Sequence, residues 1–326
     1  RCSARYLYLA SGYYDYDQGH EPEFAGRESF AGRIVHPQFW PDDLDYSGKR
    51  VVIIGSGATA VTLVPSIAKK AAHVTMLQRT PTWYAIRSSE DALANRLRKI
   101  LPDKWAYNLI RTRNVLLQRF FFNRARSKPE KVGEFLHGKI RDALGGEMET
   151  RHFQPPYNPW EQRLCLVPDS DMFESLKRGD ATIVTDHIER FDARGIALKS
   201  GEHLDADIIV TATGLKLAVA GKIAFSVDGS RIAFNEHVYY KGAMFSNIPN
   251  LAVVFGYVNA SWTLKADLVS RYFCRLINAV DASSADYAIP YLAADAQSEA
   301  EPAFDFSSGY FQRSMDILPK NGAEQP

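Results

Sequence analysis

The feature that most constrains the fold is a glycine-rich loop between a short apolar strand and a helix. Val51–Ile54 is a β-branched run typical of a buried parallel strand, and a helix is expected from about residue 58 to residue 71. A second strand is expected at His73–Gln78. The loop reads Gly55-Ser56-Gly57-Ala58-Thr59-Ala60, a GxGxxA pattern which in this order of elements predicts a βαβ nucleotide-binding unit over residues 51–79.

Each fixed position of this loop has a physical reason. Gly55 permits the tight turn after the strand, and Gly57, which lacks a Cβ, lets a pyrophosphate approach the backbone. Ala60 is small enough for close packing of helix and strand. The phosphates would bind the free N–H groups at the helix N-terminus. The alternative is a structural glycine turn without a ligand. Pro65 falls inside the expected helix, where proline costs about 3 kcal/mol unless a kink accommodates it.

The end of the second strand indicates which nucleotide binds. An NAD site usually has Asp or Glu there, whereas this chain has Gln78-Arg79-Thr80. A carboxylate would repel a 2′-phosphate, but Arg79 can hold it through a forked, charge-assisted contact. We therefore predict that Arg79 and Thr80 bind NADPH rather than NADH. The alternative for Arg79 is an ordinary surface arginine.

Composition excludes several other classes of protein. The chain has 39 basic and 38 acidic side chains, so no whole-molecule field attracts nucleic acid. No apolar run approaches the ~20 residues that span a bilayer. The three cysteines are far apart, without CxxC spacing, and predict reduced thiols in a cytoplasmic protein rather than a disulfide framework or a metal site.

Residues 88–155 are expected to form a helical insertion. Apolar residues recur there at helical spacing, and Pro102 and Pro129 interrupt the pattern. Basic residues outnumber acidic ones, for example Arg96, Arg98, Lys99, Arg111, Arg113, Arg119, Arg124 and Arg126. The simpler interpretation is a solvated basic face. The alternative is contact with a membrane surface or with an anionic substrate.

Strands return later in the chain. They are expected at Ala181–Thr185, Gly195–Lys199, Ala206–Thr211 and Leu251–Phe255, before an amphipathic helix over about residues 264–279. At the other end, residue 1 is Arg and an apolar run follows almost at once. A domain rarely starts inside a strand that has no partner. We therefore expect a fragment, or a chain clipped at its N-terminus.

A second motif precedes the nucleotide loop. It reads Phe30-Ala31-Gly32-Arg33-Ile34-Val35-His36-Pro37-Gln38-Phe39-Trp40-Pro41. This segment resembles the FxGxxxHxxxW[PD] fingerprint of type I Baeyer–Villiger monooxygenases, which are class B flavoprotein monooxygenases that use FAD, NADPH and O₂. Residues 157–169 and 256–263 are similar to the subgroup that includes the ethionamide-activating monooxygenase. The resemblance runs from residue 1 to about residue 280.

The resemblance implies an α/β fold with two dinucleotide-binding, Rossmann-like domains, the NADPH domain being inserted in an incomplete FAD domain. The implied boundaries are 1–44 for part of the FAD domain and a linker, 45–87 and 156–205 for the two parts of the NADPH domain, 88–155 for the helical insertion, and 206–326 for the C-terminal part of the FAD domain. The family's separate FAD fingerprint, a second GxGxxG, does not occur in the 326 residues.

The resemblance also implies residue roles. Arg163 matches the family's active-site arginine, a permanent cation that would stabilise an anionic flavin C4a-peroxide and the oxyanion of its adduct. Its alternative is an exposed salt-bridge arginine. The family often has Lys before this Arg, and Gln162 stands here, a departure that bears on the NADPH contact or on substrate preference. His36 would couple domain rotation to catalysis without transferring protons, or simply pack in a linker. Asn259 would line the flavin end of the pocket.

The implied function is a flavin-dependent monooxygenase that uses NADPH and O₂ to insert oxygen into a ketone or to oxidise a sulfur centre through a C4a-peroxyflavin. One alternative is N- or S-oxygenation of the flavin-containing-monooxygenase type, in which the substrate attacks a neutral hydroperoxide. An NAD(P)H–disulfide reductase would need a redox pair, and no CxxC or CxxxxC occurs. A truncated remnant that binds NADPH without turnover is the non-enzymatic alternative.

Overall fold

The chain folds into two compact units. The computed structural model describes residues 1–146, 149–162, 164–257, 261–293, 301–302 and 309–322. Unit 1 comprises residues 1–18 and 215–326, and unit 2 comprises residues 19–214, so the chain passes between the units twice.

The domain boundaries that the resemblance implies, after residues 44 and 205, remain a prediction. Two short strands determine which segments belong to unit 2. β3 (Arg33–Val35) and β12 (Ile208–Thr211) both pair within the central sheet of unit 2 rather than with unit 1. Their pairing carries the segments around them into unit 2.

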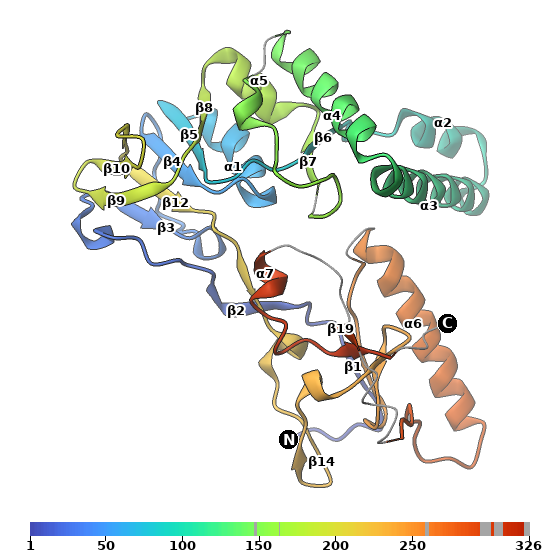
Figure 1. Cartoon of the computed structure of the whole chain (residues 1–326). Helices are drawn as coiled ribbons and strands as arrows, with labels where there is room; N and C mark the ends of the chain where they lie inside the picture. Colours follow the sequence, from blue (N-terminus) through green and yellow to red (C-terminus); the bar gives the residue numbers. More distant parts are fainter. Residues whose placement is uncertain (147–148, 163, 258–260, 294–300, 303–308, 323–326) are drawn as a thin grey trace. The chain divides into compact units, whose positions relative to one another are not determined.

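A five-stranded parallel sheet lies at the centre of unit 2 (Figure 1). Its order is β3-β12-β4-β5-β8, where β4 is Arg50–Ile54, β5 is His73–Gln78 and β8 is Ala181–Thr185. Apolar side chains of β4 alternate between two cores: Val51 and Ile53 face one, and Val52 and Ile54 face the other. Both faces of the sheet are therefore covered, as the unbroken β-branched run predicts.

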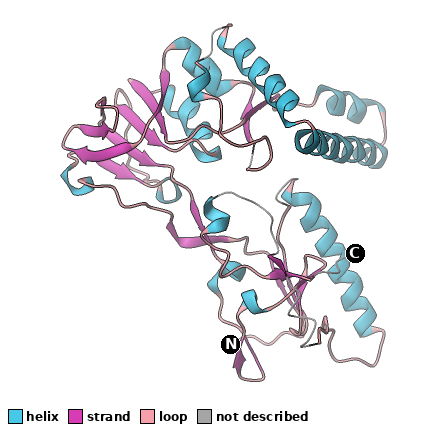
Figure 2. Ribbon diagram, viewed as in Figure 1, coloured by secondary structure: helices cyan, strands magenta, loops and turns pink. Residues whose placement is uncertain are grey.

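Helices cover one face of this sheet, and a small antiparallel sheet covers the other (Figure 2). The helices are α1 (Ala58–Ala68), α4 (Pro129–Leu144) and α5 (Asp171–Arg178). The small sheet has the order β11-β10-β9, made of β9 (Ile188–Asp192), β10 (Gly195–Leu198) and β11 (His203–Asp205). Helix α1 retains Pro65 in its interior and ends at Ala68, before the expected residue 71.

Helices dominate the segment between β5 and β8, as the sequence indicated. Beyond β6 (Tyr84–Arg87) come α2 (Ala92–Ile100), α3 (Asp103–Ser127) and α4, then β7 (Cys165–Pro168), which pairs in parallel with β6. The Asp91 side chain accepts the Ala94 N–H at 3.0 Å and caps α2. Both prolines named above lie at helix starts, Pro102 before α3 and Pro129 in the first turn of α4.

Unit 1 is built from a parallel strand pair and a long helix. β1 (Leu7–Leu9) pairs with β18 (Leu251–Val253), and α6 (Trp262–Asp281) packs on this region through Val269 and Phe273. The remaining elements are short: β2 (Tyr14–Gly19), β13 (Leu215–Leu217), β14 (Ser226–Val227), β15 (Ser230–Arg231), β16 (Tyr239–Tyr240), β17 (Met244–Phe245), β19 (Glu301–Pro302), β20 (Lys320–Asn321) and α7 (Gly309–Gln312).

Short 3₁₀ turns complete the two units. They are η1 (Arg27–Ser29), η2 (Pro37–Phe39), η3 (Thr150–His152), η4 (Val219–Lys222) and η5 (Phe234–Glu236). Among the described residues, no helix combines the length and the apolar character that a membrane crossing requires.

Candidate functional site

The turn after β4 requires glycine at its first position. Gly55 has φ 133°, and a Cβ placed on it would lie 2.3 Å from the carbonyl oxygen of Ala212. Its own N–H donates to the carbonyl of Leu77 at 2.8 Å. The loop is therefore held between the ends of β12 and β5, where a larger residue has neither the space nor the backbone conformation.

The N-terminus of helix α1 faces open space at Gly57. Gly57 is its N-cap residue. Among the residues that the structure describes, no side chain caps the helix, and a Cβ on Gly57 would meet no atom within 4 Å. The first N–H groups of a helix have no intrahelical partner, so those of Ala58, Thr59 and Ala60 can bind an anion. Ala60 itself is fully buried against the sheet. The loop thus has the open approach and the donors that a pyrophosphate needs.

The segment after β5 is tied to this loop. The Ser56 hydroxyl donates to the carbonyl of Thr80 at 3.1 Å. Arg79, which immediately precedes Thr80, is exposed. Within the described part of the chain its guanidinium makes no hydrogen bond or ion pair. The predicted phosphate loop and the predicted 2′-phosphate residues therefore lie together, with a cation available beside them.

A network of hydrogen-bonded polar side chains, which the sequence did not indicate, lies at the ends of β5 and β8. The Gln78 amide nitrogen donates to the His152 carbonyl at 2.8 Å and to the Thr185 hydroxyl at 2.9 Å. That hydroxyl lies 2.7 Å from Nδ1 of His152, whose Nε2 lies 3.2 Å from the carboxylate of Glu149. Donation runs consistently from Gln78 through Thr185 to His152 and on to Glu149.

This polar network adjoins the predicted 2′-phosphate residues, because its member Gln78 comes just before Arg79 in the sequence. Gln78 is buried and precedes Arg79, and its Oε1, also buried, has no hydrogen-bond partner within the described parts of the chain. Burial, reinforced by the neighbouring Arg151, lowers the pKa of His152. Sequence reasoning missed His152 because it lies in the turn η3 after α4, 74 residues along the sequence from Gln78.

His36 contacts both segments where the chain leaves unit 2. Its Nδ1 accepts the N–H of Gln38 at 3.2 Å, and its Nε2 lies 3.2 Å from the carbonyl of Gly214. With Nδ1 accepting, Nε2 carries the proton and donates. The ring also covers Gly19, where a Cβ would lie 2.1 Å from Cε1 of the imidazole. Residues 19 and 214 are the first and last of unit 2.

All these groups follow parallel strands of one sheet. His36 follows β3, Gly55 follows β4, Arg79 follows β5 and Thr185 ends β8. The carboxyl edge of an open parallel sheet is where ligands bind in doubly wound folds. Two further candidates, Arg163 and Asn259, lie outside the described residues.

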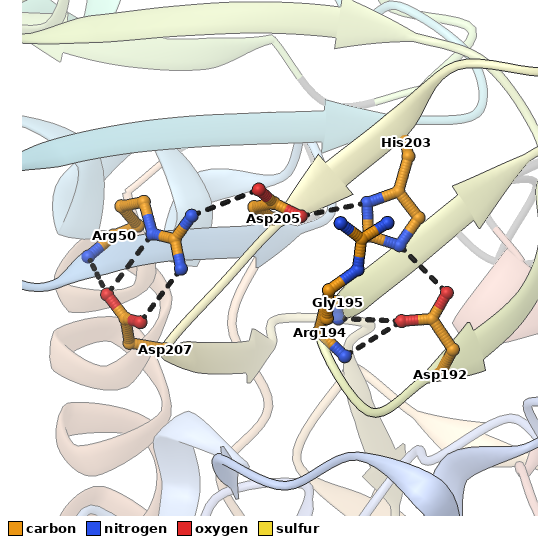
Figure 3. Close-up of polar contacts among 7 residues, drawn as sticks. All are labelled: Arg50, Asp192, Arg194, Gly195, His203, Asp205 and Asp207. Carbon is orange, nitrogen blue, oxygen red and sulfur yellow. Dashed lines mark hydrogen bonds and ion pairs between the residues drawn. The ribbon is translucent and has the colours of Figure 1, made fainter.

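A second polar cluster holds the small sheet to β4 and is structural (Figure 3). Arg50 pairs with Asp207 and with Asp205, each at 3.1 Å, and holds the pKa of the Asp207 carboxyl below its usual range. The ring nitrogens of His203 lie 2.9 Å from Asp192 and 3.1 Å from Asp205. In the described part of the chain, no group of three or more His, Cys, Asp or Glu could hold a metal ion.

Comparison with known proteins finds relatives that match nearly the whole chain. Residues 6–116 match the model of the "Flavin-binding monooxygenase-like" family. The chain is 46% identical over 325 residues to the "Probable FAD-binding monooxygenase AlmA" of Acinetobacter sp, which covers 99% of the chain and 65% of that protein. It is 47% identical over 326 residues to the "FAD-containing monooxygenase EthA" of Mycobacterium tuberculosis (strain ATCC 25618 / H37Rv), covering 99% of the chain and 66% of that protein. The chain therefore spans slightly less than two thirds of these relatives.

Solved structures show the same fold. "Oxidized steroid monooxygenase bound to NADP" superposes with a TM-score of 0.67 at 24% identity, over 87% of this chain and 62% of that one. "Open crystal structure of cyclohexanone monooxygenase" gives a TM-score of 0.67 at 18% identity, over 91% of this chain and 66% of that one. The predicted α/β, two-dinucleotide-domain fold class is confirmed, and so is the family resemblance. Along 99% of its length the chain is similar to FAD-containing monooxygenases, among them EthA and AlmA.

Proposed function

We propose that the protein containing this chain is a flavin-dependent monooxygenase that uses NADPH and O₂ to insert oxygen into a ketone or to oxidise a sulfur centre. One observation carries the proposal: an uncapped helix N-terminus opens on the Gly57 loop, with the unpaired Arg79 beside it among the described residues. The relatives named FAD-containing monooxygenases, which match along 99% of the chain, support it.

The residues present fit NADPH. The loop Gly55-Ser56-Gly57-Ala58-Thr59-Ala60 would hold the pyrophosphate, because open space and free N–H groups meet there. Arg79 and Thr80 would hold the 2′-phosphate, since Arg79 offers a forked cation that no carboxylate of the described chain engages. The cofactor would thus bind at the carboxyl edge of the unit 2 sheet, which we take as the NADPH domain.

When bound, NADPH and FAD would supply the redox chemistry, which is hydride transfer and the activation of O₂. Because the 326 residues hold a single GxGxx[GA] loop, no residue of this chain is assigned to the phosphates of FAD. Arg163 would place a cation that does not deprotonate beside the negative charge that develops on oxygen during transfer. Asn259 would line the flavin end of the same pocket.

His36 would act on conformation and not on protons. One ring nitrogen accepts a backbone N–H and the other donates to a backbone carbonyl, so neither is free to exchange a proton with substrate. Its contacts with residues 19 and 214, where the chain passes between units, support a role in coupling the units during the catalytic cycle.

The test uses the purified full-length protein. Bound flavin should give absorbance near ~450 nm, whereas a colourless protein would support the NADPH-binding remnant. A cyclic ketone and a thioether are then compared as substrates. Lactone formation that is lost in Arg163→Ala supports the Baeyer–Villiger reaction, and thioether oxidation alone, retained in that variant, supports the flavin-containing-monooxygenase type.

The proposed partners are a small ketone or thio-compound, O₂ and no nucleic acid. We propose a cytoplasmic location, which the three free cysteines support. A peripheral membrane contact through the basic helical insertion is also proposed. Fractionation of cells into cytosol, membrane and exported material would test the location.

A further inference from the structure

Helix α3 carries an exposed apolar stripe. Trp105, Leu109, Leu116 and Phe120 are 70%, 52%, 60% and 66% exposed. Because successive helical residues are rotated by about 100°, these four positions fall within an arc of about 60° and extend over roughly 22 Å of the helix. The buried residues of α3, which are Ala106, Ile110 and Ala125, lie outside this arc, as do three other exposed apolar residues, Tyr107, Val115 and Leu117. The four residues are called the α3 stripe below.

Basic side chains flank the stripe. Residues 92–128 hold ten lysines and arginines and one acidic residue, Asp103, in a chain that has 39 basic and 38 acidic side chains in all. By helical rotation, Arg119 and Arg126 lie along one side of the stripe and Arg113 and Arg124 along the other. Arg113 pairs with Asp91 at 2.6 Å, and the other three are exposed.

This combination fits the surface of an anionic membrane. A helix with a narrow apolar stripe and a basic surround lies in the plane of the interface, with apolar side chains in the acyl boundary and arginines reaching the phosphates. The exposed Trp105 suits that depth, where the indole meets both lipid and water. No described helix is apolar enough to cross a bilayer, so the helix would lie on the membrane.

Charge argues against a second copy of the chain as the occupant. Two α3 helices brought face to face would oppose six basic residues with six more, against a single acidic residue on each. Phospholipid phosphates complement the same surface. We propose that α3 docks through the α3 stripe onto an anionic phospholipid surface. This docking specifies the membrane contact of the proposed function and does not rest on oxygenase activity.

The test is vesicle flotation of the full-length protein. Wild type should bind vesicles of phosphatidylglycerol and phosphatidylcholine in equal parts more tightly than vesicles of phosphatidylcholine alone, and added salt should weaken the binding. Leu109→Gln and Phe120→Gln should each lower the affinity about tenfold, because each removes one apolar side chain from the lipid. Leu268→Gln is the matched control, since Leu268 is 50% exposed on α6 and lies outside the stripe.

Several outcomes would overturn the proposal. Absence of binding to the anionic vesicles, equal binding of wild type and the two stripe variants, or equal loss in Leu268→Gln would each do so. A dimer that the stripe variants convert to a monomer would assign the stripe to a second copy. A clear fall in thermal stability of the stripe variants would show that another part of the protein covers it. Loss of oxygenase activity with intact vesicle binding would leave the docking standing and overturn only the enzymatic proposal.

Discussion

The imidazole of His36 donates to the carbonyl of Gly214 across 3.2 Å, and the same carbonyl accepts the backbone N–H of His20 at 3.0 Å. One acceptor thus joins both segments through which the chain leaves unit 2, and His36 fixes the junction by lying against Gly19. The histidine of the Phe30–Pro41 motif therefore has a structural reason to be a histidine. It needs one nitrogen to accept and one to donate within a single flat ring.

Replacing Gly19 tests this junction. A Cβ at residue 19 would overlap the His36 ring, so Gly19→Ala should displace the imidazole from Gly214 and destabilise unit 2 by about 1–3 kcal/mol. His36→Ala removes the obstacle, and the double variant should therefore lose less than the sum of the single variants. Urea unfolding of all four proteins gives the coupling energy, expected at about 0.5–3 kcal/mol. Strict additivity would contradict the contact.

The two loop glycines should separate folding from binding. At Gly57 the backbone conformation is ordinary and the space is open, so Gly57→Ala should change the free energy of unfolding by less than about 0.5 kcal/mol. Its methyl group would nevertheless occupy the approach of the pyrophosphate, and the Kd for NADPH should rise roughly tenfold.

Gly55→Ala is the matched comparison for that variant. Its Cβ would press on the Ala212 carbonyl from a left-handed backbone, so we expect a loss of stability of about 1–3 kcal/mol. Titration calorimetry and urea unfolding distinguish the two effects. Unchanged NADPH affinity in Gly57→Ala would place the phosphates elsewhere.

Arg79 should decide the choice between NADPH and NADH. A charge-assisted contact with the 2′-phosphate contributes about 1.5–3 kcal/mol, so Arg79→Gln should raise KM for NADPH roughly 10- to 100-fold. The KM for NADH should hardly change, because NADH has no phosphate at that position. Arg87→Gln, an exposed arginine at the end of β6, is the control. An equal rise for both nucleotides would assign Arg79 to a general electrostatic role.

The local parts of this architecture could be predicted and the long-range parts could not. Strand β4, its loop and α1 form one continuous segment, and each residue choice reports directly on that geometry. β3 and β12 hold three and four residues and pair across more than 170 positions of sequence. Segments so short carry little pairing information of their own, so the sequence could not predict which segments join unit 2 through β3 and β12.

The candidate site divides in the same way. Gly55, Gly57 and Arg79 can be recognised from the sequence, because binding a dinucleotide would fix their residue type and spacing. Gln78 and Thr185 are ordinary polar residues at strand ends, and only the register of β5 with β8 makes them neighbours. Their third partner, His152, lies in the turn η3. No periodic pattern in the sequence predicts where that turn lies relative to β5 and β8.

The hydrogen-bond network that joins Gln78, Thr185 and His152 should make the free energy of unfolding depend on pH near neutrality. Folding lowers the pKa of His152 from its ordinary 6.5, mainly through burial, so the unfolded chain binds the proton more readily. The contribution of the buried, neutral His152 to the free energy of unfolding is therefore complete above pH 6.5. It is lost as the pH falls below that value. His152→Gln does not titrate, and its unfolding free energy should fall less than that of wild type over this range.

Thr185→Val tests the same hydrogen-bond network without removing the titrating group, His152. It leaves the buried Gln78 amide and Nδ1 of His152 each short of a partner, so stability should drop by about 1–3 kcal/mol at every pH. Because His152 stays buried, the pH-dependent fall should persist in this variant. Urea unfolding between about pH 7.5 and about pH 5.5 separates the two effects, since that window lies above the range in which the carboxylates titrate. A wild-type slope in His152→Gln would mean that another group supplies the pH dependence.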